Sequence, residues 1–135
     1  MQLTQLSLRN RRIWLLLGSG MVAGVIVLSL IPVEVNLGED SDKLAHFLAY
    51  GSLSLWFGMI FASRGRQLGI AVAFAALGAT LEFLQDMTGY RSFEIADMVA
   101  NAIGAVLGWG LAQTPLRNGL AWIERRILGV PSSPP

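Results

Sequence analysis

Most of the ionisable side chains of this chain are gathered into two short segments. Residues 34–50 and 82–101 hold eight of the nine acidic residues and the only histidine. Both segments lie on the same side of four apolar stretches. If those stretches span a membrane, six polar residues meet at one rim: Lys43, His46, Glu82, Arg91, Asp97 and Asn101. A bilayer tolerates such groups only where they find partners, so their collection at one depth indicates a site.

Helical spacing places these polar residues on shared helix faces that should converge. The three sets are Lys43, His46 and Tyr50; Glu82 and Gln85; and Asp97 and Asn101. Such a cluster could support proton transfer, with Glu82 and His46 as a candidate acid–base pair. Its cations could also bind an anionic group such as a lipid phosphate. A divalent metal held by His46, Glu82 and Asp97 is a weaker option, because a single histidine makes zinc unconvincing. We therefore predict neither a metal nor a cofactor.

Each polar residue also has a plain structural explanation. His46 could be an interhelical hydrogen-bonding group, and Asp42 could be the N-cap of the second span. Lys43 could extend its ammonium group to the interface. Arg91 could merely neutralise a buried carboxylate, Glu82 or Asp97. Taken together, however, these explanations require all the groups to gather at one end for packing alone, so we favour a functional site.

The composition is that of a membrane protein rather than a soluble domain. Of the 135 residues, 53% are hydrophobic and 14% are charged, whereas soluble domains carry about 25% charged residues. The absence of cysteine excludes disulfides, thiolate catalysis and cysteine-ligated zinc sites. The net charge is +1 and the ten basic residues form no long run, so we do not expect nucleic acid as a partner.

Four apolar stretches predict an all-α integral membrane protein with four spans, over residues 13–31, 43–63, 68–87 and 95–113. The first stretch is too long for the apolar part of a signal peptide, and no cleavage site follows it, so we expect it to be retained. Short connections predict antiparallel neighbours in an up-down bundle. Eight of the ten basic residues lie on the side of the termini, which the positive-inside rule places in the cytoplasm.

The flanking regions are expected to be cytoplasmic. Residues 1–12 form a basic N-terminus, residues 13–113 the four-helix domain, and residues 114–135 an amphipathic segment followed by a disordered tail from 130. In that segment, apolar residues recur at helical spacing and predict a short helix in the membrane interface, with Trp122 at head-group level. Its polar side is expected to carry Arg117, Glu124, Arg125 and Arg126.

Small residues should bring the spans together, because close contact rather than the hydrophobic effect drives helix association in lipid. The first span carries Gly20 and Gly24. The fourth span has a stripe at strict four-residue spacing, formed by Ala96, Ala100, Gly104, Gly108 and Ala112. We expect most of these residues to serve packing only.

The polar residues and their spacing resemble the VanZ-like family of bacterial multi-pass membrane proteins. The shared pattern is D-K-x-x-H, E-x-x-Q, R and D-x-x-x-N-x-x-G-x-x-x-G. Its positions here are Asp42 to His46, Glu82 to Gln85, Arg91, and Asp97 to Gly108. The resemblance covers about half of the chain and implies a multi-pass protein of the bacterial cytoplasmic (inner) membrane. The namesake of the family is associated with low-level resistance to the glycopeptide teicoplanin, and that role transfers only weakly to relatives.

From these observations we expect an outward-facing site that binds an anionic lipid-linked component of the cell envelope and could modify it. The expected binding residues are Lys43, Tyr50, Gln85, Arg91, Asp97 and Asn101. Besides the bilayer, the expected partner is a lipid-linked molecule or phospholipid at the outer leaflet. The alternative is a non-catalytic scaffold or accessory subunit whose polar cluster is structural or binds a partner protein. The residues leave open whether a reaction occurs and whether the bundle oligomerises.

Overall fold

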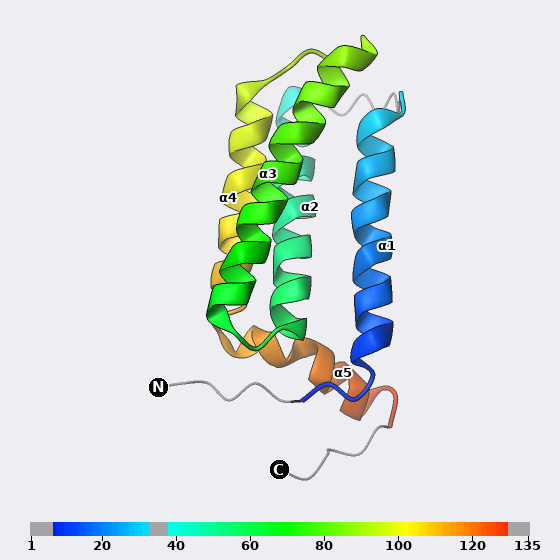
Figure 1. The fold of residues 1–135 in the computed structure, drawn as a ribbon, viewed down its shortest axis with the longest axis vertical. Helices are drawn as coiled ribbons and strands as arrows, with labels where there is room; N and C mark the ends of the chain where they lie inside the picture. The colour runs from blue at the N-terminus through cyan, green and yellow to red at the C-terminus, as the bar shows by residue number, and fades with distance from the viewer. Residues whose placement is uncertain (1–6, 33–37, 130–135) are drawn as a thin grey trace.

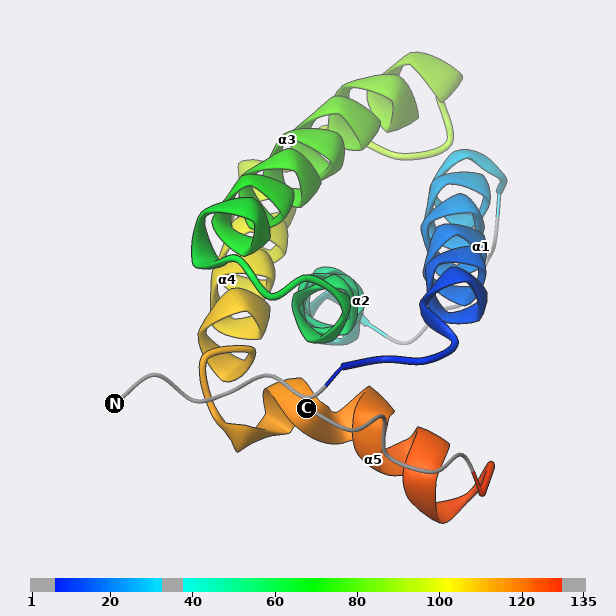
Figure 2. The same ribbon diagram turned by 60° about the horizontal axis from the view of Figure 1, so that its bottom comes forward.

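The computed structural model of this protein describes residues 7–32 and 38–129. Within these ranges all regular structure is helical: α1 (Arg11–Leu30), α2 (Glu39–Ile60), α3 (Arg64–Thr88), α4 (Ile95–Leu111), a 3-10 turn η1 (Pro115–Asn118) and α5 (Gly119–Arg126). Helices α1 to α4 run along the long axis of the molecule, and α5 lies across one end (Figure 1). Viewed toward that end, α2 lies between α1 on one side and the pair α3 and α4 on the other (Figure 2).

Two of these helices, α1 and α3, are long and apolar enough to cross a membrane, with mean hydropathies of 2.3 and 1.7. A third candidate span arises only if α4 is joined to the η1–α5 segment, from which it is bent by 77°. Helix α2 is long enough, at 22 residues, but is not among the candidate spans, because polar residues such as Asp42, Lys43 and His46 lower its mean hydropathy. The helical fold is therefore confirmed with two or three candidate spans, and the four-span topology stays a prediction.

The second helix begins earlier than the sequence analysis expected. It begins at Glu39 rather than Lys43, with Gly38 as its N-cap at a φ of 85°. Acidic side chains are favoured in the first turn of a helix by its macrodipole, so part of the predicted polar loop is helical. The prediction of Asp42 as the N-cap is therefore wrong, because Asp42 lies one turn inside the helix. Residues 1–6, 33–37 and 130–135, which include Glu34 and the predicted tail, lie outside the described residues.

Helices α2 and α4 pack backbone against backbone through glycines. A Cβ atom on Gly104 would overlap the carbonyl oxygen of Phe47, and one on Gly108 would overlap the carbonyl oxygen of Gly51. This close approach confirms the packing role predicted for part of the stripe on the fourth span. Ala96, at the start of the stripe, is exposed. A strict spacing of four drifts around a helix of 3.6 residues per turn, so the stripe cannot face one neighbour along its whole length.

The glycines of α1 do not take part in comparable packing. A Cβ atom on Gly20 or Gly24 would meet nothing within 4 Å, so the prediction that these two residues bring the first span into close contact is wrong. The buried residues of α1, Trp14 and Gly18, lie near its beginning, and Val22 and Val25 pack, partly buried, against the core. The indole of Trp14 packs against that of Trp56 at 5.7 Å between ring centroids. The Nε1–H of Trp56 donates to the backbone oxygen of Trp14 at 3.1 Å.

Helix α5 is fixed to the start of α1 by one buried carboxylate, Glu124. Its oxygens accept hydrogen bonds from the backbone N–H of Arg9 (2.9 Å), the backbone N–H of Asn10 (2.8 Å) and Nε1–H of Trp14 (2.8 Å). Burial alone would raise the pKa of Glu124, but these hydrogen bonds outweigh it and the pKa lies below its ordinary value. The prediction that Glu124 and Arg117 line an exposed polar side is wrong, because both are buried.

Candidate functional site

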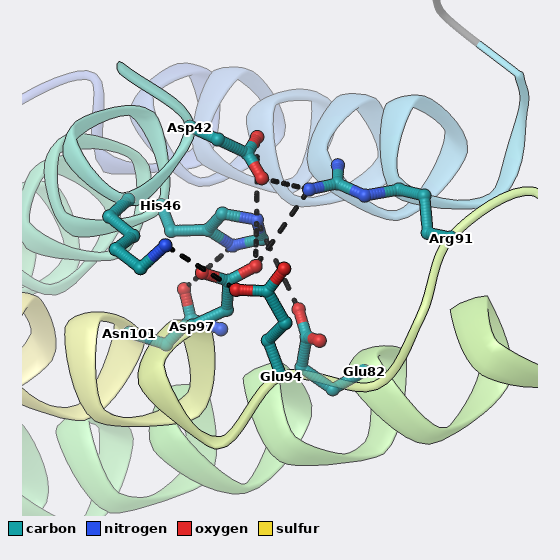
Figure 3. A network of polar contacts seen from close by, with 8 residues as sticks. Asp42, His46, Glu82, Arg91, Glu94, Asp97 and Asn101 are labelled. Carbon is teal, nitrogen blue, oxygen red and sulfur yellow. Dashed lines mark hydrogen bonds and ion pairs between the residues drawn. The ribbon is translucent and has the colours of Figure 1, made fainter. Parts of the chain in front are cut away.

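The imidazole of His46 lies at the centre of a cluster built from α2, α3 and α4 (Figure 3). Its Nδ1 lies 3.0 Å from Oδ1 of Asn101 on α4. Its Nε2 faces three carboxylates, at 3.7 Å from Oδ2 of Asp97, 4.0 Å from Oε1 of Glu82 and 4.0 Å from Oδ1 of Asp42. One ring nitrogen therefore binds an amide, and the other faces a concentration of negative charge.

Two cations border this arrangement. The Nη2 of Arg91 contacts Oδ2 of Asp42 and lies 3.8 Å from Oδ2 of Asp97. The Nζ of Lys43 lies 3.3 Å from Oε2 of Glu94. Arg91 belongs to the segment between α3 and α4, and α3 ends at Gly89 in the left-handed conformation that glycine adopts readily. This turn brings the guanidinium back over the start of α2.

We call these eight residues the polar cluster: Asp42, Lys43, His46, Glu82, Arg91, Glu94, Asp97 and Asn101. The cluster lies at the end of the bundle opposite α5 (Figure 1), because it combines the start of α2, the end of α3 and the start of α4. The six rim residues named from the sequence are thus brought together. Two members were not assigned to the site from the sequence: Asp42, which was interpreted as an N-cap, and Glu94, which lies three residues before Asp97.

The inner part of the polar cluster is buried. Glu82 and Asp97 are 2% exposed and Asn101 is 1% exposed. Among the described residues, no hydrogen-bond partner is found for Oε1 of Glu82 or Oδ1 of Asp97. Asn101 fits because Gly78 has no side chain, since a Cβ atom there would lie 2.7 Å from Nδ2 of Asn101. Two buried carboxylates thus carry oxygens with no donor in the described parts of the chain.

Tyr50 and Gln85, which were predicted from the sequence to be binding residues, are both buried. Both are 2% exposed. Tyr50 belongs to an apolar core cluster with Leu53, Phe74 and Ala105. Gln85 is on α3, three residues after Glu82, and its Nε2 has no hydrogen-bond partner among the described residues. The structure therefore places Tyr50 in the apolar core, and Gln85 is buried one turn from Glu82.

The charges of the polar cluster do not balance. Asp42, Glu82, Glu94 and Asp97 are four carboxylates, whereas Lys43 and Arg91 are two cations. With His46 neutral, the formal charge of the cluster is −2. Both cations already contact carboxylates. The arrangement can hold a cation directly, and it can hold an anion only through the partly exposed side of Lys43 and Arg91.

Comparison with known proteins agrees with the pattern of residues that forms this site. The sequence model of the VanZ/LLP1 family matches residues 4–117, a stretch that contains the whole polar cluster. The chain belongs to the VanZ/LLP1 family. The resemblance found from the sequence is thereby confirmed.

One relative of this VanZ/LLP1 protein comes from the fission yeast Schizosaccharomyces pombe and is named an uncharacterized protein. The two chains are 36% identical over 80 residues, which is 57% of this chain and 46% of the yeast protein. The chain therefore spans less than half of the length of that relative. No solved structure matches. Because the relative is eukaryotic, family membership by itself does not imply a bacterial envelope.

Proposed function

We propose that this VanZ/LLP1 protein is a four-span membrane protein whose polar cluster opens toward the outer leaflet and binds the phosphate of an anionic lipid or lipid-linked envelope molecule. The topology is supported by the distribution of basic residues, eight of which lie in or beside the two termini and the connection between α2 and α3. The positive-inside rule then directs the opposite end, with the polar cluster, away from the cytoplasm. In a bacterium, the membrane would be the cytoplasmic one.

One observation carries the proposal: buried acid, imidazole and amide groups from three helices converge at a single end of the bundle. The Nε2 of His46 lies within 3.7–4.0 Å of three carboxylates. Ionisable groups inside membrane helices are costly and are kept mainly where they serve a site. The side chains of Lys43 and Arg91 are 33% and 40% exposed, so both can reach a phosphate from the lipid side.

The cluster also holds groups that could move a proton once a ligand is bound. Glu82 and His46 are close enough to exchange a proton through a small shift or through one bridging group of the ligand. Asn101 orients the imidazole from the other side through Nδ1, and Asp97 lies beside Glu82 at Nε2. If the ligand is a cell-wall precursor lipid, such binding would alter susceptibility to glycopeptides such as teicoplanin, as the family's namesake suggests.

Native mass spectrometry of the protein in mild detergent tests the binding proposal. We expect a phospholipid or pyrophospholipid to be retained, and the joint change Lys43→Gln and Arg91→Gln to remove it. The matched control is Arg126→Gln, which removes an exposed cation from α5 at the other end. Equal lipid retention by all three proteins would refute the assignment of the phosphate to this end.

A second candidate function is a scaffold whose partner protein covers the same end. It is favoured by the exposed apolar side chains beside Arg91, since Met87 is 82% and Tyr90 is 67% exposed. A stoichiometric protein that copurifies with the chain and is lost on Arg91→Ala, with no retained lipid, would support the scaffold over the lipid site.

A further inference from the structure

Three side chains of the polar cluster present donor atoms in an arrangement that suits a metal ion. One oxygen of Asp42, one ring nitrogen of His46 and one oxygen of Asp97 all lie within 4.8 Å of one another. Ligands bound about 2.1 Å from one ion lie roughly 3–4 Å apart. The distances from His46 Nε2 to the oxygens of Asp97 and Asp42, 3.7 and 4.0 Å, fall in that range.

The hydrogen bond on the other side of the ring directs the lone pair of His46 toward these oxygens. Nδ1 lies 3.0 Å from the amide oxygen of Asn101, so with that oxygen as acceptor Nδ1 carries the proton. In the neutral ring, Nε2 then has its lone pair facing the carboxylates, which is repulsive unless a proton or a metal cation lies between them. Histidine ligands of metals commonly donate their second ring N–H to an oxygen in this way.

Buried oxygens without partners provide an independent indication. Oε1 of Glu82 and Oδ1 of Asp97 belong to side chains that are 2% exposed, and neither has a hydrogen-bond partner among the described residues. The former lies 4.0 Å from His46 Nε2, on the same side of the ring as the other carboxylates. A buried polar oxygen with no partner is costly, and a cation in this space would bind Oε1 of Glu82 and offset the charge of Asp97.

We propose that the polar cluster binds one divalent first-row metal ion through Asp42, His46 and Asp97, with Glu82 as a fourth ligand. The charge supports this inference, because an ion of charge +2 cancels the formal −2 of the cluster. Three carboxylates and one imidazole nitrogen suit Mn²⁺ better than Zn²⁺, because most of the ligand atoms are carboxylate oxygens. This proposal replaces our expectation from the sequence that the site holds no metal.

A bound metal ion would also explain how the polar cluster binds a phosphate, and this part of the inference rests on the proposed function. A cluster of charge −2 repels a phosphate, whereas the same cluster with its ion is neutral and offers a Lewis acid to a phosphate oxygen. Lys43 and Arg91 would then need only to hold the outer oxygens of the phosphate. The ligand class would be a phosphate or pyrophosphate monoester or diester on a lipid.

Mn²⁺ binding to the purified full-length protein tests the site. After chelator treatment in detergent, electron paramagnetic resonance should detect one bound Mn²⁺ per chain. We expect Asp97→Asn and His46→Gln to lower the affinity at least tenfold. The matched control is Asp40→Asn, which removes one exposed negative charge from the same end of α2 and should change the affinity less than twofold. No stoichiometric binding, or an equal loss in the control, would overturn the proposal.

A measurement on the unchanged protein keeps the test valid if the variants do not fold. Pulsed electron paramagnetic resonance should detect the coupling of one imidazole nitrogen to the bound Mn²⁺, because His46 is the only histidine. Bound Mn²⁺ without nitrogen coupling would overturn the assignment to His46. The lipid measurement is separate: retained phospholipid without Mn²⁺ binding refutes only the metal site, and Mn²⁺ binding without retained lipid refutes only the proposed function.

Discussion

Replacing Gly104 by alanine tests whether the α2–α4 contact determines the stability of the bundle. The new Cβ would overlap the backbone oxygen of Phe47 and lie 3.2 Å from the backbone nitrogen of Gly51. Both obstacles are backbone atoms, which cannot move aside as a flexible side chain would. Overpacking of this kind costs about 1–3 kcal/mol. Alanine also favours the helix over glycine by about 1 kcal/mol, which offsets part of that cost.

The control Gly110→Ala separates the cost of overpacking from the gain in helix propensity. Gly110 is in the same helix, and a Cβ atom there would meet nothing within 4 Å. The gain in helix propensity is the same for both variants and cancels in their comparison. Gly104→Ala should therefore be less stable than Gly110→Ala by about 1–3 kcal/mol, the overpacking cost alone. Unfolding by SDS in mixed micelles, followed by tryptophan fluorescence, measures the difference.

The same two variants test whether the packing of α2 against α4 affects metal binding by the polar cluster. Forcing α2 and α4 apart lengthens the contact between His46 and Asn101, which joins these helices at 3.0 Å. Mn²⁺ affinity should therefore fall in Gly104→Ala and remain unchanged in Gly110→Ala. If the two variants are equally stable, the glycine contact does not limit the approach of the helices and the reasoning is wrong.

Two further changes address single charges. Glu124→Gln should destabilise the protein by about 1–3 kcal/mol near neutral pH, because a buried acceptor of three hydrogen bonds is replaced. The pKa of Glu124 is lowered in the folded protein, so its stabilisation is complete above the ordinary value of 4.5 and is lost as the pH falls through the folded value. The difference in stability between wild type and variant should thus stay constant above pH 4.5 and narrow as the pH falls further, and a difference that stays constant in acid would contradict the role of the ionised carboxylate. Arg91→Gln should raise the affinity for Mn²⁺ about fivefold, because it removes a partly exposed cation that competes for Asp42 and Asp97; unchanged affinity, as expected for Arg126→Gln, would count against metal binding there.

The convergence of the polar residues could be predicted because it depends on helix geometry alone. Spacings of three, four and seven residues fix which side chains share a face. Short connections then force the start of α2, the end of α3 and the start of α4 to one end. Neither step requires knowledge of a loop conformation. His46, Glu82, Asp97 and Asn101 therefore meet as the pattern indicated.

The ion pairs of the two partly exposed cations, Lys43 and Arg91, could not be predicted in the same way. The partner of Lys43 is Glu94 and the nearest partner of Arg91 is Asp42. Arg91 and Glu94 both lie in the connection between α3 and α4, where no periodicity fixes the direction of a side chain. From the sequence, Arg91 was expected to pair with Glu82 or Asp97, and only the pair with Asp97 is observed.

The burial of Glu124 was missed for a different reason. Two of its three donors are backbone N–H groups 114 and 115 residues earlier in the chain, and the third is the indole of Trp14. Backbone donors have no signature in a sequence, since every residue except proline has one. A glutamate beside two arginines on a short helix therefore looked like part of an exposed charged face. The docking of α5 beneath α1 decides its environment.

The hydrogen bonds of Glu124 also have a consequence for biosynthesis. Helix α1 is held by a residue that is translated 110 residues after Trp14, and elsewhere α1 contributes few buried side chains. We therefore expect α1 to remain loosely associated with its neighbours until the C-terminal segment has emerged. A chain terminated before Glu124 would release the N-terminal helix to the surrounding lipid and expose it to membrane quality-control proteases.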